Sequence, residues 1–505
     1  MSHSPVIEAQ RYRAEPSVLT ALRTPRLLTR EVLAGLVVAL ALIPEAISFS
    51  IIAGVDPRVG LFSSFVMAVS IAVLGGRPAM ITAATGAVAL VIAPVARDYG
   101  IDYFIATVIL AGVFQVILGL VGVARLMRFI PRSVMVGFVN ALAILIFIAQ
   151  LPHLLGVPWL VYPLIAAGLL IMILMPRITK VVPAPLVSIV VVTAVVAIFG
   201  IAVPTVGDQG ELPRSLPELF LPNIPISWDA FTIIAPYALA MALVGLLESL
   251  LTAKLVDDIT DTRSRKGREA WAQGVANILS GLFGGMGGCA MIGQTMINVK
   301  ASGARTRIST FLAGAFLLVL VVVLGDVVAI IPMAALVAVM IMVSVATFDW
   351  HSIRPATLKR MPWSETIVMV ATVVVVVATH NLAIGVIVGV LVAMVLFARR
   401  VAHFATVTRI EALDEPVPTA YYVVNGELFF ASSNDLTTQF EYAADPSRVV
   451  IDMSRSHIWD ASTVAAIDAI VTKYDSHGKR VVLEGMNDAT TELHGRLSGN
   501  LGGQH

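Results

Sequence analysis

Two glutamates, Glu45 and Glu248, stand inside long apolar stretches of the sequence, where a carboxyl group is costly to bury and is a functional candidate. Gly86 lies 41 residues after Glu45, and Cys289 lies 41 residues after Glu248. In both cases the second position falls in a segment rich in glycine or other small residues. The equal spacing predicts two equivalent halves, each with one acid and one broken membrane segment.

Both acids can do proton chemistry, because burial disfavours the charged form of a carboxyl group. Each also has a structural interpretation. Glu45 follows Pro44, which frees backbone groups inside a helix, so its carboxylate could bond that backbone instead. Glu248 could cap a neighbouring helix. We favour a proton-coupling role for Glu248 and a role for Glu45 in shaping the binding site.

Residues 284–302, GGMGGCAMIGQTMINVKAS, interrupt the second half of the chain. Five glycines lie between Gly284 and Gly293, and glycine is unfavourable in a helix interior. Residues 290–299 then predict a half-helix of roughly 15 Å, about half of the ~30 Å apolar layer of a bilayer. Gln294, one turn into it, can donate two hydrogen bonds to an oxyanion, although it could instead only hold helices together.

A matching interruption lies upstream at residues 80–94, MITAATGAVALVIAP, after the breaker residues Gly75, Gly76 and Pro78. A helix that begins in the middle of the membrane directs unpaired backbone N–H groups at its surroundings, and these favour an anion. Such paired interruptions in matching halves indicate a transporter site. The alternative is two ordinary spans with glycines at packing contacts.

The composition is that of a protein that crosses the membrane several times, since 58% of the 505 residues are hydrophobic and 13% are charged. The net charge of +1 gives no reason to expect nucleic acid as a partner. Cys289 is the single cysteine, so no intrachain disulfide is possible. We recognise no hydrolytic triad or metal-ligand cluster in the spans, and we therefore expect no enzyme activity, cofactor or metal.

Apolar runs able to span or half-span the membrane occur seven times in each half of the chain. An odd number inverts the second copy relative to the first, so we predict an all-α membrane domain of 14 segments in a 7+7 inverted repeat with two half-helices. The predicted parts are an N-terminal segment 1–30, repeat 1 at 31–205, a connector at 206–230, repeat 2 at 231–400 and a tail at 401–505. The runs themselves are 31–53, 59–74, 81–95, 101–123, 133–151, 157–175, 184–203, 231–256, 270–283, 290–299, 308–330, 333–348, 365–379 and 383–397.

The basic residues support this span count. If the spans alternate from a cytoplasmic N-terminus, 24 of the 34 Lys and Arg residues fall in cytoplasmic segments up to residue 400, and only Arg58, Arg97 and Arg214 fall outside. The remaining seven lie in the tail after Val401. Cytoplasmic loops of membrane proteins carry this excess. We therefore expect a multi-pass protein of a bacterial-type cytoplasmic (inner) membrane with both termini in the cytoplasm and no signal peptide.

The tail changes composition and predicts a small soluble α/β domain. Residues 421–424 and 427–431 alternate around Asn425-Gly426, which indicates a hairpin. Residues 449–453 and 481–483 indicate strands, and Asp460 can cap a helix whose apolar face includes Val464 and Ile467.

Three stretches resemble the sulfate permease (SulP) family of anion transporters: IPEAISFSIIAGVDPRVGLFSSF at 43–65, TAATGA at 82–87 and INVKASGARTR at 297–307. The tail resembles the STAS domain of that family and of anti-sigma factor antagonists, through VVIDMSRSHIWDAST at 449–463. The resemblance covers nearly the whole chain. It implies that spans one to four and eight to eleven move against the other six, and it implies a homodimer.

The resemblance also implies where the substrate binds, between the third and tenth segments and beside the first and eighth. Carried onto this chain, the substrate-binding residues are Glu45, Thr82, Ala84, Thr85, Gly86, Ala290, Met291, Gln294 and Thr295, with Glu248 beside them. Many relatives have arginine where we align Gln294, so this chain lacks a fixed positive charge there. This departure argues against electroneutral anion exchange and favours entry together with a cation.

In the tail, Ser462 aligns with the serine that is phosphorylated in anti-sigma factor antagonists. One hypothesis is therefore a regulatory phosphorylation of Ser462, with a cytoplasmic regulatory protein bound at the STAS domain. The alternative is an ordinary serine in the first turn of a helix.

The leading hypothesis is a secondary active transporter of a small anion, a dicarboxylate or an inorganic oxyanion such as sulfate, coupled to H+. A sodium-coupled bicarbonate transporter, an anion exchanger and an uncoupled channel are alternatives on the same fold. A membrane receptor or scaffold is the alternative from another class, but paired half-helices with paired acids exceed what anchoring in membrane lipid requires.

Overall fold

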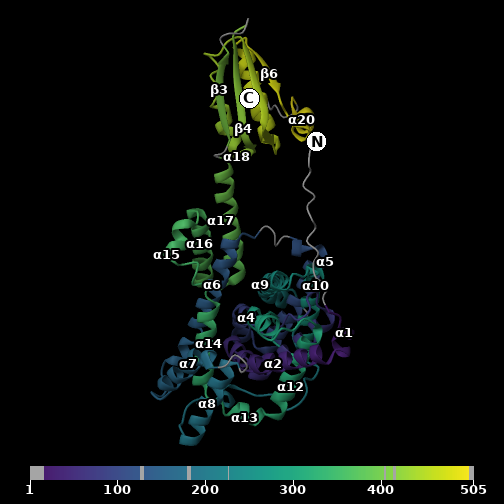
Figure 1. The fold of residues 1–505 in the computed structure, drawn as a ribbon, viewed down its shortest axis with the longest axis vertical. Helices are drawn as coiled ribbons and strands as arrows, with labels where there is room; N and C mark the ends of the chain where they lie inside the picture. The colour runs from purple at the N-terminus through teal and green to yellow at the C-terminus, as the bar shows by residue number, and fades with distance from the viewer. Residues whose placement is uncertain are drawn as a thin grey trace. The chain divides into compact units, whose positions relative to one another are not determined.

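The computed structural model describes residues 16–125, 130–178, 183–225, 227–402, 405–412 and 417–499. Residues 1–15 of the predicted N-terminal segment lie outside this part of the chain. The chain divides into two compact units, Met1–Val390 and Leu391–His505 (Figure 1). The first is helical and the second contains a four-stranded sheet, in agreement with the predicted fold class.

The first unit begins with a short helix and seven predicted segments. In order they are α1 (Val18–Arg23), α2 (Pro25–Ala53), α3 (Pro57–Leu74), β1 (Thr82–Ala83) with α4 (Gly86–Tyr99), α5 (Ile101–Val121), α6 (Arg132–Ile148), α7 (Val161–Ile178) and α8 (Ala184–Phe199).

The second set repeats this order, with a strand and a short helix in the third place. Its elements are α9 (Trp228–Thr260), α10 (Lys266–Leu282), β2 (Cys289–Ala290) with α11 (Ile292–Met296), α12 (Arg307–Val323) with α13 (Gly325–Ala329), α14 (Met333–Thr347), α15 (Pro355–Arg360), α16 (Trp363–Thr379) and α17 (Leu382–Ala402). Within the described chain, seven helices are long and apolar enough to cross a membrane, and four shorter apolar helices accompany them.

Helices from the two sets pack against one another in the first unit. α10 lies against α5 and α3, and α12 lies against α2 and α3. The approach of α5 to α10 is close, because a Cβ atom on Gly274 would lie 2.5 Å from the carbonyl oxygen of Gly112. Small residues allow helices to approach in this way in membranes, where burial of apolar surface does not drive association.

The second unit is a sheet with the strand order β3 (Thr406–Ala412), β4 (Thr419–Leu428), β5 (Arg448–Ile458) and β6 (Arg480–Glu484). β3 pairs antiparallel with β4, and the other two pairs are parallel. The helices α18 (Phe430–Thr437), α19 (Ala461–Ser476) and α20 (Asp488–Leu497) complete it. Val464 and Ile467 of α19 are buried, and Asp460 caps that helix by accepting a bond from the backbone N–H of Thr463 at 3.0 Å.

The predicted hairpin at Asn425-Gly426 is wrong. These residues lie inside the continuous strand β4, where the register with β5 shifts between Val423 and Asn425. Gly426 has φ of 106°, so the glycine serves an irregularity in the strand and not a turn. Because β4 is held between β3 and β5, its partners on both sides keep it extended through a dipeptide that favours turns in isolation.

Candidate functional site

The two interruptions predicted from the sequence meet in the structure. β1 and β2 pair antiparallel, with Thr82 opposite Ala290 and Ala83 opposite Cys289. Their backbones pass so closely that a Cβ atom on Gly288 would lie 1.9 Å from the carbonyl oxygen of Ala83. The glycine-rich run is therefore needed for this crossing, and α4 and α11 both begin beside the small sheet.

α4 begins at Gly86 and is capped by Thr85, a predicted site residue. Thr85 Oγ1 accepts a hydrogen bond from the backbone N–H of Val88 at 3.4 Å. The backbone N–H of Ala84 donates to Ser64 Oγ at 3.3 Å. Ala84, Thr85 and Gly86 are all buried, so the positive end of this helix lies inside the domain.

α11 begins later than predicted. Ala290 still belongs to β2, and the backbone N–H of Met291 donates to the carbonyl of Ile81 at 2.9 Å, which keeps the chain extended. Met291 then precedes the first helical residue and supplies no side-chain cap. A π-helical segment, Ile297–Ala301, continues α11, and together they match the predicted half-helix in length.

The carboxylate of Glu248, on α9, connects to both half-helices through the single cysteine. Cys289 Sγ donates to Glu248 Oε2 at 2.9 Å, and Thr85 Oγ1 lies 3.1 Å from the same sulfur. All three side chains are buried. A chain of hydrogen bonds therefore joins the acid to the cap of α4. Sequence spacing had located Cys289 at the mouth of the second half-helix but had given it no role.

Glu45 and Gln294 meet across the two repeats. Glu45 on α2 is half-buried, and the side chain of Gln294 on α11 lies beside its carboxylate. Gln294 is 2% exposed, and its Oε1 atom has no partner among the described residues. A buried polar atom without a partner is unusual, so this amide points to a place where a ligand or water belongs.

The hydroxyl groups of two other predicted site residues are engaged in the framework. Thr82 Oγ1 accepts from Gln273 Nε2 at 3.0 Å, and Thr295 Oγ1 accepts from the backbone N–H of Ile81 at 3.0 Å. These bonds fix β1 between α10 and α11. Both side chains therefore hold the strands in place, and their predicted role in substrate binding stays a prediction.

The framework also uses amides that the sequence analysis did not select. Asn277 accepts the backbone N–H of Gly288 at 2.8 Å and donates to Gln115 Oε1 at 2.8 Å. Ser249, next to Glu248, accepts the backbone N–H of Ala290 at 3.0 Å. The available signal was the presence of amide and hydroxyl side chains in apolar spans, where a polar group without a partner is costly.

Two further buried acids, Glu31 and Glu269, were also missed. Glu31 accepts three backbone N–H groups at the start of α12, from Arg305, Thr306 and Ser309, at 2.7 to 3.2 Å. Glu269 accepts the backbone N–H groups of Gly76 and Arg77 at 2.6 and 3.0 Å, and its other oxygen accepts the amide of Gln273. Both side chains are fully buried, and their backbone partners are far away in the sequence, which is why spacing gave no hint of them.

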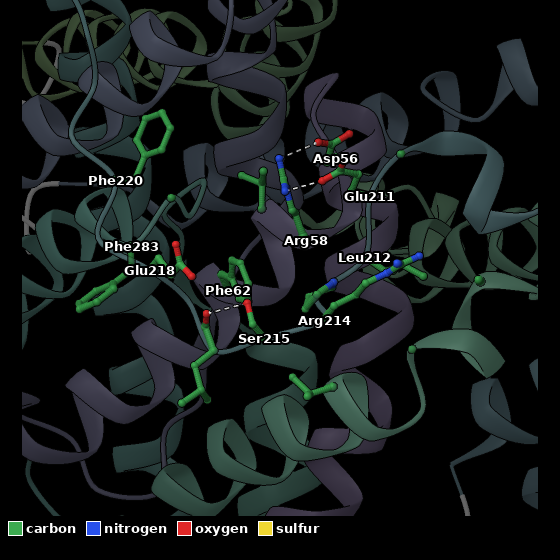
Figure 2. A pocket seen from close by; sticks show the side chains of 18 of the residues that line it. Asp56, Arg58, Phe62, Glu211, Leu212, Arg214, Ser215, Glu218, Phe220 and Phe283 are labelled. Atoms are coloured by element: carbon green, nitrogen blue, oxygen red, sulfur yellow. Dashed lines mark hydrogen bonds and ion pairs between the residues drawn. The ribbon is translucent and has the colours of Figure 1, made fainter.

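A large pocket of about 1400 Å³ lies elsewhere, between the connector and the ends of α3, α5 and α13 (Figure 2). Its described lining includes five carboxylates and two arginines. Figure 2 shows Arg58 paired with Asp56 and Glu211. The excess of negative charge in this pocket does not suit an anion. We therefore place the candidate site at the half-helices and not in this pocket.

Ser462 lies in the second unit, in the first turn of α19, and its side chain is exposed. It is therefore accessible to another protein, and its place in the helix equally fits the structural interpretation.

Comparisons with known proteins agree with this architecture. The sulfate permease family profile matches residues 28–164 and 159–372, and the STAS domain profile matches 412–498. The Bacillus subtilis protein named "Putative sulfate transporter YbaR" is 53% identical over 92% of this chain and 96% of its own. A bicarbonate transporter, BicA, of Picosynechococcus is 28% identical over 74% of this chain and 70% of its own.

Two solved structures share the fold. The transmembrane domain of a cyanobacterial BicA matches with a TM-score of 0.63 at 24% identity, over 73% of this chain and 97% of that domain. The murine anion transporter Slc26a9 in its inward-facing state matches with a TM-score of 0.78 at 16% identity, over 97% of this chain and 89% of its own. With these matches, the helical unit and the sheet unit are a membrane domain and a STAS domain, and the chain belongs to the sulfate permease family.

Proposed function

We propose that this chain is a secondary active transporter that moves a small anion together with a proton by alternating access. The observation that carries the proposal is the convergence of two half-helices, one from each repeat, on one buried place with a carboxyl group from each repeat beside it. The helix ends favour negative charge, and an ionised carboxylate nearby repels it. Protonation removes that repulsion, so proton binding and anion binding favour each other.

The contacts of Cys289 suggest how protonation of Glu248 changes the hydrogen bonds that are offered to the anion. While Glu248 is ionised, the thiol donates to it, and the hydroxyl of Thr85 donates to the sulfur. When Glu248 is protonated, its own O–H donates to the sulfur and the thiol turns to Thr85 Oγ1. The hydroxyl hydrogen of Thr85 is then released at the start of α4, where it can donate to an anion.

Gln294 and Glu45 supply a second contact in this proposal. The amide of Gln294 donates to an ionised Glu45, but a protonated Glu45 can donate to the amide oxygen instead. The amide then has both N–H bonds available for an oxyanion. The anion is thus held by backbone N–H groups at the starts of α4 and α11 and by Gln294, without a fixed positive charge.

The substrate class we propose is a dicarboxylate or an inorganic oxyanion such as sulfate. The name of the relative YbaR supports sulfate, and the name of BicA supports a second candidate, a bicarbonate carrier for which we would expect sodium as the coupling ion. A backbone site recognises negative charge more than identity, so the geometry accommodates either anion.

Uptake into proteoliposomes tests the proposal directly. Labelled sulfate, bicarbonate and a C4-dicarboxylate are offered with an inward proton gradient, with an inward sodium gradient, or with neither. We expect one anion to accumulate above its outside concentration only with the proton gradient. Accumulation that needs sodium would favour the second candidate, and counterflow or current without accumulation would identify an exchanger or a channel.

We also propose the placement that the sequence predicts: residues 1–30 and 401–505 in the cytoplasm, repeats at 31–205 and 231–400, and the connector 206–230 outside an inner membrane. The sorting of basic residues supports this orientation. A homodimer, and regulation at the exposed Ser462 by a cytoplasmic protein, complete the proposal. Crosslinking in the native membrane tests the dimer, and a Ser462→Asp variant tests the regulation.

A further inference from the structure

A second pocket, of about 700 Å³, lies where the last turn of α5, the residues after it, α9, the start of α10 and α6 come together. The sorting of basic residues predicts that this end of the membrane domain faces the cytoplasm. It contains neither half-helix end, nor Glu45, nor Glu248. Its chemistry therefore needs an explanation of its own.

Three cations, Arg125, Lys254 and Lys266, line this pocket, and no carboxylate belongs to its described lining. None of the ion pairs among the described residues involves these three side chains. The pocket thus differs from the larger one at the connector, where acids outnumber arginines. Three cations without acidic partners around one cavity favour a ligand with concentrated negative charge.

The start of α10 adds hydrogen-bond donors to these charges. Lys266 and Gly267 are its first two residues and line the pocket, and no side chain caps this end of the helix. A Cβ atom on Gly267 would have no neighbour within 4 Å, so the backbone there is open to the cavity. Uncapped N–H groups at the positive end of a 17-residue helix, next to two lysines and an arginine, suit a phosphate group.

The remaining wall of the pocket is apolar, and it continues onto a face of α5 that the protein leaves uncovered. Leu120 lines the pocket and is 73% exposed. Val113, Ile117 and Val121 lie on the same side of α5 by helical spacing and are also exposed. In a membrane domain such a face contacts acyl chains. The pocket therefore joins a phosphate-binding end to a surface for acyl chains.

We propose that this pocket binds an anionic phospholipid, with the headgroup phosphate between Arg125, Lys254 and Lys266 and an acyl chain along Leu120 and its neighbours on α5. A free phosphate ion would satisfy the cations but leave the apolar wall without a partner. Because α6, α9 and α10 all contribute lining residues, a bound lipid contacts all three helices at once.

The test measures thermal stabilisation of the full-length protein in detergent as a phospholipid is titrated. Phosphatidylglycerol is compared with phosphatidylcholine and with inorganic phosphate. We expect phosphatidylglycerol alone to raise the melting temperature in a saturable way. Each cation near an anionic lipid contributes about 1 kcal/mol, or about fivefold in affinity, so Lys254→Gln with Lys266→Gln should weaken binding about 25-fold.

A matched control is Lys359→Gln with Arg360→Gln, which removes two exposed cations of α15 that do not line the pocket. This variant should bind phosphatidylglycerol as the unaltered protein does. Equal stabilisation by phosphatidylcholine or by inorganic phosphate would overturn the proposal, as would equal weakening in the control. Without lipid, both variants should have the melting temperature of the unaltered protein, because the four side chains make no described ion pair. If a variant has a lower melting temperature, lipid binding is compared instead by native mass spectrometry, which measures the lipid that stays bound.

Discussion

The membrane domain contains two kinds of acid, and their surroundings differ. Glu31 and Glu269, in the framework, accept backbone N–H groups from segments far away in the sequence. Glu248 and Glu45, at the half-helices, each have one side-chain partner among the contacts described, a thiol and an amide. The framework acids are fixed by several bonds at once. The acids at the site can change protonation by rearranging a single bond.

In our proposal this contrast separates acids that hold the fold from acids that take part in the transport cycle. Removing a framework acid leaves several buried N–H groups unpaired, and each of those costs free energy. Removing a site acid leaves at most one side-chain donor, a thiol or an amide, without a partner. Substitutions at the two kinds of acid should therefore affect different measurements.

The largest effect is expected for Glu248→Gln. The amide cannot carry a proton through the cycle, but its oxygen can still accept the thiol of Cys289, so the site keeps its shape. We expect proton-driven accumulation to be abolished while counterflow exchange of the same anion continues. Both are measured in the same proteoliposomes, and accumulation that persists with its pH dependence intact would remove Glu248 from the coupling step.

The next effect concerns the connection between Glu248 and Thr85. Cys289→Ala breaks this connection. We expect the accumulation ratio under a proton gradient to fall about tenfold, which corresponds to a loss of about 1.4 kcal/mol in the coupling free energy between proton and anion. Cys289→Ser keeps a donor and an acceptor in the same place and should retain coupling. If both variants accumulate the anion equally well, the thiol has no part in coupling, whatever the outcome for Glu248→Gln.

Glu31→Ala tests the other side of the comparison. Three backbone N–H groups at the start of α12 lose a buried acceptor, which should destabilise the protein by about 3 kcal/mol or more. Thermal unfolding in detergent measures this loss, and Glu365→Ala, an exposed acid in the first turn of α16, is the control. Proton coupling should survive in the protein that remains folded. A loss of coupling at unchanged stability would show that Glu31 is not simply a framework acid.

The smallest effect is expected for Gln294→Ala. The amide oxygen already lacks a partner among the described residues, so its removal should cost little stability. A hydrogen bond to a charged group contributes about 1.5–3 kcal/mol, so half-maximal uptake should need at least about tenfold more anion. Saturation curves at one fixed proton gradient measure this. An unchanged curve would mean that Gln294 only joins α11 to α2.

Much of this fold could be predicted from the sequence, because apolar runs and breaker residues report local requirements. The glycines at 284–288 and the short apolar run after them predicted a broken segment, and the structure has one. The π-helical segment Ile297–Ala301 and the late start of α11 were not predictable. The late start of α11 depends on bonds to Ile81 and to Ser249 of α9, and Asn298 in the π-helical segment donates to the carbonyl of Ala79 at 2.8 Å. All three partners lie far away in the sequence.

The site could be predicted only in part for the same reason. Intramembrane position singled out Glu45 and Glu248, and their spacing paired them with the half-helices. Nothing local distinguishes Glu31 or Glu269, which lie near span ends where an acid is ordinary, although both are fully buried. The incorrect hairpin at Asn425-Gly426 arose in the same way, since the neighbouring strands of the sheet override a local turn signal.

The two-residue pairing of β1 with β2 has a consequence for stoichiometry. Because Thr82 and Ala83 lie opposite Ala290 and Cys289, the two helix ends share one place, and their partial charges act on the same ion. Two helix ends of about half a charge each together balance about one univalent anion, and a second anion about 4 Å from the first would be repelled by roughly 4 kcal/mol at an effective dielectric constant of 20. If the proposed site is correct, we therefore expect it to hold one univalent anion at a time, with each repeat supplying half of it.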